Sequence, residues 1–186
     1  MDSIHVHYAK GFCVMNALKE YIGADKLNAA LRRYVEDTKF QTAPFTTSQE
    51  FLKYIRAAVP EDLNYIVRDW FEHITFYDLA VHKAVSKETG GGHYLVKIDY
   101  AVKKTYADGQ GMETSAPLND LIPFAVFGEG GRVLHYEKHR ISAESGTLEI
   151  TVNDIPVRVS VDPHMLLMDR DEEDNSASVE PGLPSI

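Results

Sequence analysis

Cysteine is nearly absent from this 186-residue sequence, which contains a single one, Cys13. One cysteine cannot form a disulfide within the chain, and it leaves too few thiolates for a zinc site built on cysteine. Long apolar runs are also missing, so no membrane-spanning helix is predicted and the chain as given is expected to be soluble. Basic residues number 19 against 28 acidic ones, and the formal net charge of -9 argues against nucleic acid as a partner.

The rest of the composition is that of a globular protein. Hydrophobic residues make up 44% and charged residues 25% of the sequence, and a chain of this length can bury roughly 70% of its unfolded surface. Part of the acidity is concentrated in the segment Asp169–Asp174, just before a Ser- and Pro-containing end. That segment lacks the central glycine and the closing glutamate of a calcium loop, so a solvated segment is the favoured interpretation.

The first part of the chain has helical periodicity. Between Lys10 and Ile74 apolar residues recur at i, i+3 and i+4, which predicts four helices. Thr47 and Glu50 have the spacing of a capping box at the start of the third helix, and Gly23 is placed to end the first. The stripes expected to face the core are Phe12, Met15, Leu18 and Ile22 on the first helix and Leu27, Ala30, Leu31, Tyr34 and Val35 on the second.

After Thr75 the period falls to two, which is the signature of strands. The alternation is clearest over residues 94–102, and turn residues such as Asp108-Gly109 and Asn153-Asp154 separate the strands. Six or seven short strands predict an antiparallel, immunoglobulin-like β-sandwich, and helices followed by strands define an α+β fold. The predicted domains are a helical part at 1–76, a β-sandwich at 77–170 and an acidic, flexible tail at 171–186.

Candidate catalytic or metal-binding motifs are few. No H-E-x-x-H run occurs, in which two histidines would bind zinc while the glutamate activates a water. His5 and His7 would share a strand face but supply only two ligands, so a polar pair is favoured over a metal site completed by an acidic partner. Cys13 lies on the first turn of a predicted helix, where a thiol can be activated, but its apolar neighbours favour a buried small residue.

One segment carries a family resemblance. Tyr8-Ala9-Lys10-Gly11 runs directly into the first predicted helix and resembles the Tyr-x-Lys-Gly segment of aminopeptidase N-like zinc peptidases. The similarity continues through the helical part, and the later strands are similar to the β-sandwich and closing segment of that family. The residues that carry it further are Ala17-Leu18, Tyr21-Ile22-Gly23, Leu27, Leu31, Phe40, Pro44, Thr47, Asp69-Trp70-Phe71, Tyr77-Asp78, Pro156, Val161-Asp162-Pro163 and Asp169 through Asn175.

The resemblance implies a catalytic role for Tyr8. In that family the matching phenol donates a hydrogen bond to the oxyanion that forms when zinc-bound water attacks a peptide carbonyl. A phenol stays protonated at neutral pH, and such a donor contributes roughly 3–4 kcal/mol to transition-state stabilisation. Lys10 and Gly11 are expected to be structural. The competing interpretation is that the Tyr8 ring packs against the first turn of the helix.

The family's zinc-binding H-E-x-x-H, its third ligand and its G-x-M-E-N segment all lie upstream of that tyrosine. We therefore expect Met1 to mark a truncation through the catalytic domain, with zinc as a cofactor of the full-length parent and none in this fragment. The fragment alone is expected to be inactive. The partners implied are a peptide substrate for the parent and the upstream zinc-binding part of the same polypeptide, and the divided helical domain predicts a homodimer of the fragment.

The resemblance is closest to large bacterial proteins in which the peptidase follows transporter-permease-like membrane segments. The parent is then membrane-anchored, and outside that subgroup it is cytoplasmic. The alternative from a different class is a non-enzymatic interaction module, in which helices and a sandwich bind another protein through a sheet edge or a helical stripe. An upstream H-E-x-x-H decides between the two.

Overall fold

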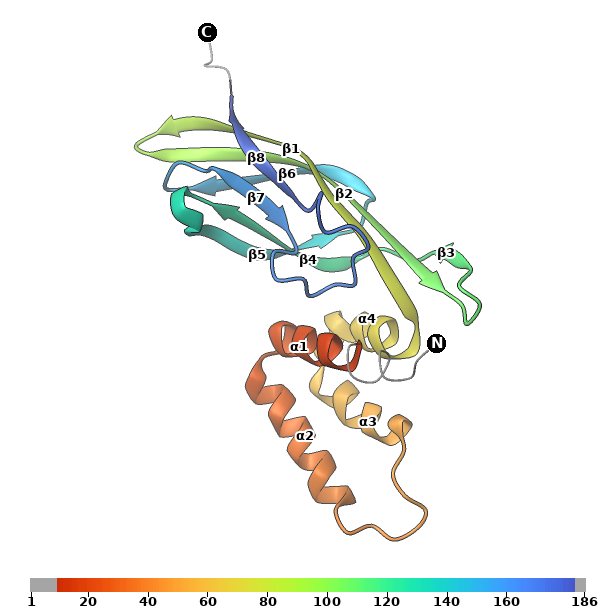
Figure 1. Ribbon diagram of the computed structural model, residues 1–186. Coiled ribbons are helices and arrows are strands. Elements are labelled where there is room, and N and C mark those ends of the chain that lie inside the picture. Colours follow the sequence, from red (N-terminus) through yellow and green to blue (C-terminus); the bar gives the residue numbers. More distant parts are fainter. Residues whose placement is uncertain (1–9, 183–186) are drawn as a thin grey trace. The chain divides into compact units, whose positions relative to one another are not determined.

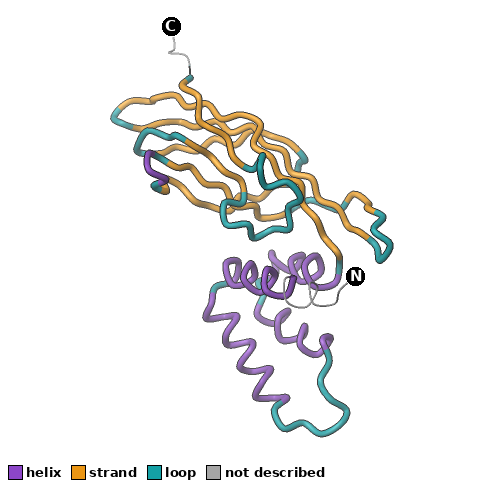
Figure 2. Tube along the Cα trace, in the orientation of Figure 1, coloured by secondary structure: helices purple, strands orange, loops and turns teal. Residues whose placement is uncertain are grey.

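The computed structural model describes residues 10–182 and separates the chain into two compact units, which divide between Ile74 and Thr75. Unit 1 is helical and unit 2 is built of strands, so the predicted α+β order is confirmed (Figures 1 and 2). Among the described residues, no helix is long and apolar enough to cross a membrane.

Unit 1 contains α1 (Gly11–Ile22), α2 (Ala24–Thr38) and α3 (Ser48–Ala58). The fourth predicted helix consists of three short pieces instead. They are the 3-10 turn η2 (Glu61–Leu63), α4 (Asn64–Val67) and the π-helical turn η3 (Arg68–Glu72). The π-helical turn η3 ends where the His73 N–H donates to the Arg68 carbonyl at 3.0 Å, which is a hydrogen bond between residues five apart.

The local signals for helix ends are confirmed. Gly23 has φ of 89°, a conformation that suits glycine, and its N–H donates to the Lys19 carbonyl at 2.9 Å where α1 gives way to α2. At the start of α3 the Glu50 N–H donates to Thr47 Oγ1 at 3.3 Å, while the Thr47 N–H donates to Glu50 Oε2 at 3.1 Å. The reciprocal pair is a complete capping box.

The predicted helix faces are partly wrong. Phe12 is 72% exposed and Val35 is 56% exposed, and the residues that α1 buries are Val14, Ala17, Leu18 and Ile22. Leu18 and Ile22 are buried as predicted, whereas Val14 and Ala17 take the buried positions that were assigned to Phe12 and Met15. Cys13 is exposed, so the prediction of a buried thiol was also wrong.

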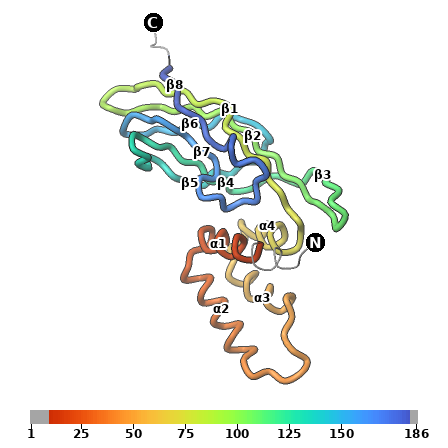
Figure 3. The backbone as a smooth tube through the Cα atoms, viewed as in Figure 1, coloured from red at the N-terminus to blue at the C-terminus, as the bar shows by residue number. Residues whose placement is uncertain are grey.

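Unit 2 contains eight strands among the described residues. They are β1 (Ile74–Gly90, whose first residue belongs to unit 1), β2 (His93–Ala107), β3 (Glu113–Ser115), β4 (Asp120–Phe127), β5 (Val133–Ile141), β6 (Ser145–Val152), β7 (Arg158–Val161) and β8 (Ser176–Pro181). The sheet order is β3-β2-β1-β8-β7-β4-β5, and β6 pairs with β2 (Figure 3). Most pairs are antiparallel, but β1 and β8 are parallel, so the sheet is mixed.

The strands form one curled, connected sheet, and an immunoglobulin-like sandwich is not confirmed. The connection runs through β8, because Ser176–Ser178 pair with β7 while residues 179–181 pair with β1. Within the segment predicted as a flexible tail, residues 176–181 form β8 and are part of the sheet. The acidic residues before it form a hydrogen-bonded loop, in which Asn175 Nδ2 donates to Asp169 Oδ2 at 2.8 Å.

The core of unit 2 comes from the inward positions of β2, β4 and β7. Val96, Ile98 and Val102 of β2 are fully buried, and so are Ile122, Phe124 and Val126 of β4. The ring of Tyr100 on β2 meets the ring of Phe124 on β4 edge-on, with 5.5 Å between centroids. On β2 the period of two therefore also predicts which face is buried, whereas on β4 residues 122–126 are buried on both faces.

Candidate functional site

The described part of the predicted site begins at Lys10, because Tyr8, His5 and His7 lie outside the described residues. Lys10 precedes α1, and its Nζ donates a hydrogen bond to the His73 carbonyl at 3.2 Å. Burial lowers the pKa of Lys10 from its ordinary value. The ammonium thus joins the start of α1 to the residue that follows η3, which gives Lys10 a structural role.

A hollow of about 430 Å³ lies at the start of α1. Its volume is in the range of small-molecule sites. It is lined by Lys10, Gly11, Val14, Met15, Phe51, Trp70 and Phe71. One wall is ordered by ring packing, since Trp70 contacts Tyr21 edge-on with 5.1 Å between ring centroids.

The lining of this hollow limits what it can do. It offers one ammonium and apolar walls, and none of its lining residues is a histidine, a carboxylate or a thiol. A side chain added at Gly11 would meet nothing within 4 Å, so no described atom requires a glycine there. The hollow can therefore bind an apolar group, but the described residues around it supply no nucleophile and no metal ligand.

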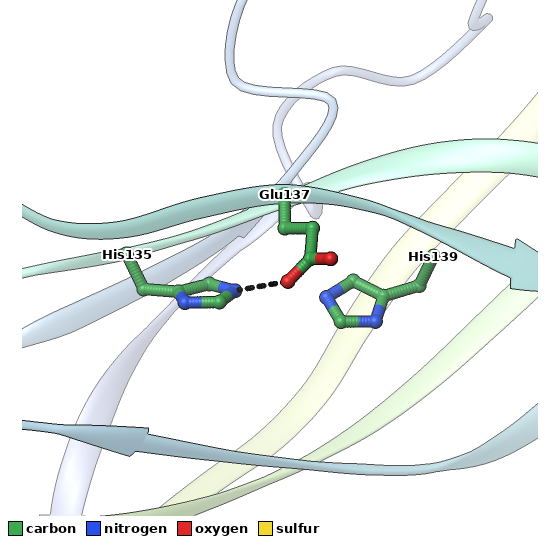
Figure 4. Close-up of side chains that lie close together, drawn as sticks. All are labelled: His135, Glu137 and His139. Carbon is green, nitrogen blue, oxygen red and sulfur yellow. Dashed lines mark ion pairs between the residues drawn. The ribbon is translucent and has the colours of Figure 1, made fainter.

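A second polar group lies in unit 2, on β5, and the sequence reasoning missed it. His135, Glu137 and His139 extend from one face of the strand toward one another (Figure 4). His135 Nε2 lies 3.8 Å from Glu137 Oε2, and burial lowers the pKa of His139 while the Glu137 carboxylate opposes that shift. The signal in the sequence was H-x-E-x-H, the i, i+2, i+4 spacing that places three side chains on one face of a strand.

Comparison with known families bears on unit 1. Residues 2–70 match the model of the Peptidase family M1 domain, whose members are in general zinc-dependent peptidases. The match includes Tyr8-Ala9-Lys10-Gly11 and ends at Trp70, and it confirms the resemblance to aminopeptidase N-like peptidases for this part of the chain. No curated protein matches the chain.

Proposed function

We propose that the chain is a carboxy-terminal part of a zinc-dependent aminopeptidase, an enzyme that removes amino-terminal residues from peptides. The observation that carries the proposal is the match of residues 2–70 to the family M1 domain, because the Tyr-x-Lys-Gly segment lies within it. Unit 2 is then the β-sandwich domain that follows the catalytic domain in the parent. The fold order of helices before strands supports that assignment.

The chemistry proposed for this chain rests on the Tyr8 phenol. In the parent, zinc held by upstream residues would supply the activated water. Tyr8 donates its hydroxyl proton as a hydrogen bond to the carbonyl oxygen of the scissile peptide as negative charge develops on it. A neutral donor is suited to this task because its own charge does not change as the oxyanion forms.

Unit 1 supports this role by fixing the start of α1. The Lys10 ammonium is bound to the His73 carbonyl, and α1 buries four apolar residues in the helical core. Tyr8 precedes this anchored lysine by two positions in the sequence. The hollow beside Lys10 and Gly11 is apolar and open to a further part of the parent polypeptide or to an apolar substrate side chain.

The proposal is tested in the parent enzyme with a chromogenic aminoacyl substrate. Tyr8→Phe is expected to lower kcat by about 10²–10³-fold with little change in KM, since only a transition-state interaction is removed. Tyr94→Phe, a tyrosine of β2 in unit 2, is the matched control and should leave both constants unchanged. Full activity of Tyr8→Phe would refute the catalytic role.

Two further experiments test whether the chain is part of a peptidase or an interaction module. The 186-residue chain alone should release no amino acid from the substrate, because the sequence holds no H-E-x-x-H, and measurable release would contradict this. A parent reading frame without that motif upstream would favour the interaction module instead. We also propose that the chain self-associates through unit 1, which light scattering tests. We further propose that the parent is membrane-anchored, which apolar membrane-spanning segments in the parent sequence would support.

A further inference from the structure

The group on β5 occupies an unusual position in the sheet. Within the described strand path β5 is the last strand and pairs with β4. The register places His135 opposite Val126, Glu137 opposite Phe124 and His139 opposite Ile122. Directly opposed residues in an antiparallel pair point to the same face, so the three polar side chains share the face on which β4 buries its apolar residues.

This face of β5 is polar, whereas the paired residues of the neighbouring strand β4 are apolar. The three residues of β4 opposite the group are fully buried and apolar, whereas β5 supplies two imidazoles and a carboxylate. Ile141, the next residue on the same face, is again apolar and buried. The polar run is thus confined to three consecutive inward positions.

The imidazoles have unmet bonding capacity. His135 Nε2 and His139 Nε2 are both buried, and neither has a hydrogen-bond partner among the described residues. The centroids of the two rings lie 5.9 Å apart with 30° between the ring planes, and the rings of His139 and Phe124 pack edge to face. Burying an unpartnered ring nitrogen costs stability, so two of them in one place indicate a missing partner.

The distances suit a metal ion as that partner. Each of the three residues offers one ligand atom, and these atoms all lie within 4.8 Å of one another. Two ligand atoms of a tetrahedral zinc site are about 3.3 Å apart when each lies about 2.0–2.1 Å from the ion. The His135–Glu137 separation of 3.8 Å is close to that value.

We propose that His135, Glu137 and His139 bind one Zn²⁺ ion on the inner face of β5. Imidazole nitrogen and carboxylate oxygen are ligands that zinc accepts, and three protein ligands leave a fourth position for water. The site is independent of the proposed peptidase function, because it lies in unit 2 and outside the residues that match the family M1 domain.

A different physical explanation exists for the carboxylate alone. Inward-pointing charges on an edge strand prevent it from pairing with another sheet edge. Glu137 fits that purpose, since it lies opposite Phe124 on the inward face and its side chain, 65% exposed, still reaches solvent. The explanation leaves both buried imidazole nitrogens unpartnered, whereas a bound ion uses them and the carboxylate together.

The test uses the untagged 186-residue chain, freed of metal with a chelator and titrated with Zn²⁺ against a chromophoric competitor. We expect one ion per chain at this site. Two variants, Glu137→Gln and His139→Gln, should each weaken the zinc affinity of the site at least about tenfold. The Glu137 side chain is exposed, so its replacement should not disturb folding. Co²⁺ should give visible d–d absorption that both variants lose. Circular dichroism checks that the variants are folded.

The control is His5→Gln/His7→Gln, which removes the other histidine pair and should leave this zinc affinity unchanged. Three outcomes would overturn the proposal: no binding by the wild-type chain below millimolar Zn²⁺, affinity equal to wild type in both β5 variants, or loss of the site in the His5/His7 variant. None of these outcomes bears on the Tyr8 test, whose readout is peptidase activity of the parent.

Discussion

Lys104 Nζ lies 2.8 Å from Asp120 Oδ2, and the two side chains are 0% and 3% exposed. The same ammonium donates to Asp120 Oδ1 at 3.1 Å, and Tyr77 Oη donates to Asp120 Oδ2 at 2.7 Å. The network joins β2, β4 and β1, which are not all neighbours in the sheet. A buried carboxylate that accepts from a cation and a phenol is well compensated, whereas one that loses the cation is not.

Replacing Lys104 should therefore destabilise unit 2 strongly. Lys104→Met keeps most of the side-chain volume but leaves Asp120 charged and buried, so the free energy of unfolding should fall by roughly 3–5 kcal/mol. The measurement is urea unfolding followed by circular dichroism of the strands, because the single tryptophan, Trp70, lies in unit 1.

Lys97→Met is the matched control for that experiment. Lys97 is on the same strand and pairs with Glu149, but both side chains are about half exposed, so removing the pair should have little effect. Equal losses in the two variants would show that the buried position of Lys104 is unimportant.

Asp162 should make unit 2 less stable as the pH rises from 4 to 6. Burial raises the pKa of this carboxyl from its ordinary 3.8 to about 6, and the Leu167 N–H donates to its Oδ2 at 2.8 Å. The folded state thus holds a proton that the unfolded chain releases near pH 4. The stabilisation is complete below that pH and is lost as the pH rises through about 6, a change of about 3 kcal/mol.

Asp162→Asn removes the titration while keeping an acceptor for Leu167. Asparagine also tolerates the positive φ of 41° at this position. Unfolding free energies measured at pH 4, 5, 6 and 7 should show that the difference between the wild type and the variant changes in favour of the variant as the pH rises. A constant difference would assign the pH dependence to other carboxyl groups.

The capping box should stabilise unit 1 measurably. Thr47→Ala removes the acceptor for the Glu50 N–H and should lower the free energy of unfolding by about 1 kcal/mol. Trp70 fluorescence during urea unfolding reports the change. Ser48→Ala, one residue further on and exposed, should change stability by less than about 0.5 kcal/mol, and a larger loss there than at Thr47 would contradict the assignment.

Elements set by short-range patterns could be predicted from the sequence. The capping box, the glycine after α1 and the apolar alternation of β2 each depend on neighbouring residues, and all three are in the structure. The buried face of α1 could not be predicted as well. Phe12 is the larger apolar residue, but the helical core accepts Val14 and leaves Phe12 exposed, which is a property of tertiary packing.

The candidate sites and two strands could not be predicted from short-range patterns. β5 was missed because its inward positions are polar, so the alternation of apolar and polar residues that identifies a strand fails at His135, Glu137 and His139. β8 was missed because it is polar and follows acidic residues, and its pairing partners are distant in the sequence. The role of Tyr8 rests on resemblance rather than periodicity, and it stays a prediction.

The pairing of β8 has a consequence for how the protein is made. This strand is the last of the described chain, yet it lies between β1, the first strand of unit 2, and β7. During synthesis from the amino terminus the helices can assemble early, since their contacts are local. β1 has no neighbour on that side until residues 176–181 have been synthesised, and before then that edge is open to pairing with other molecules.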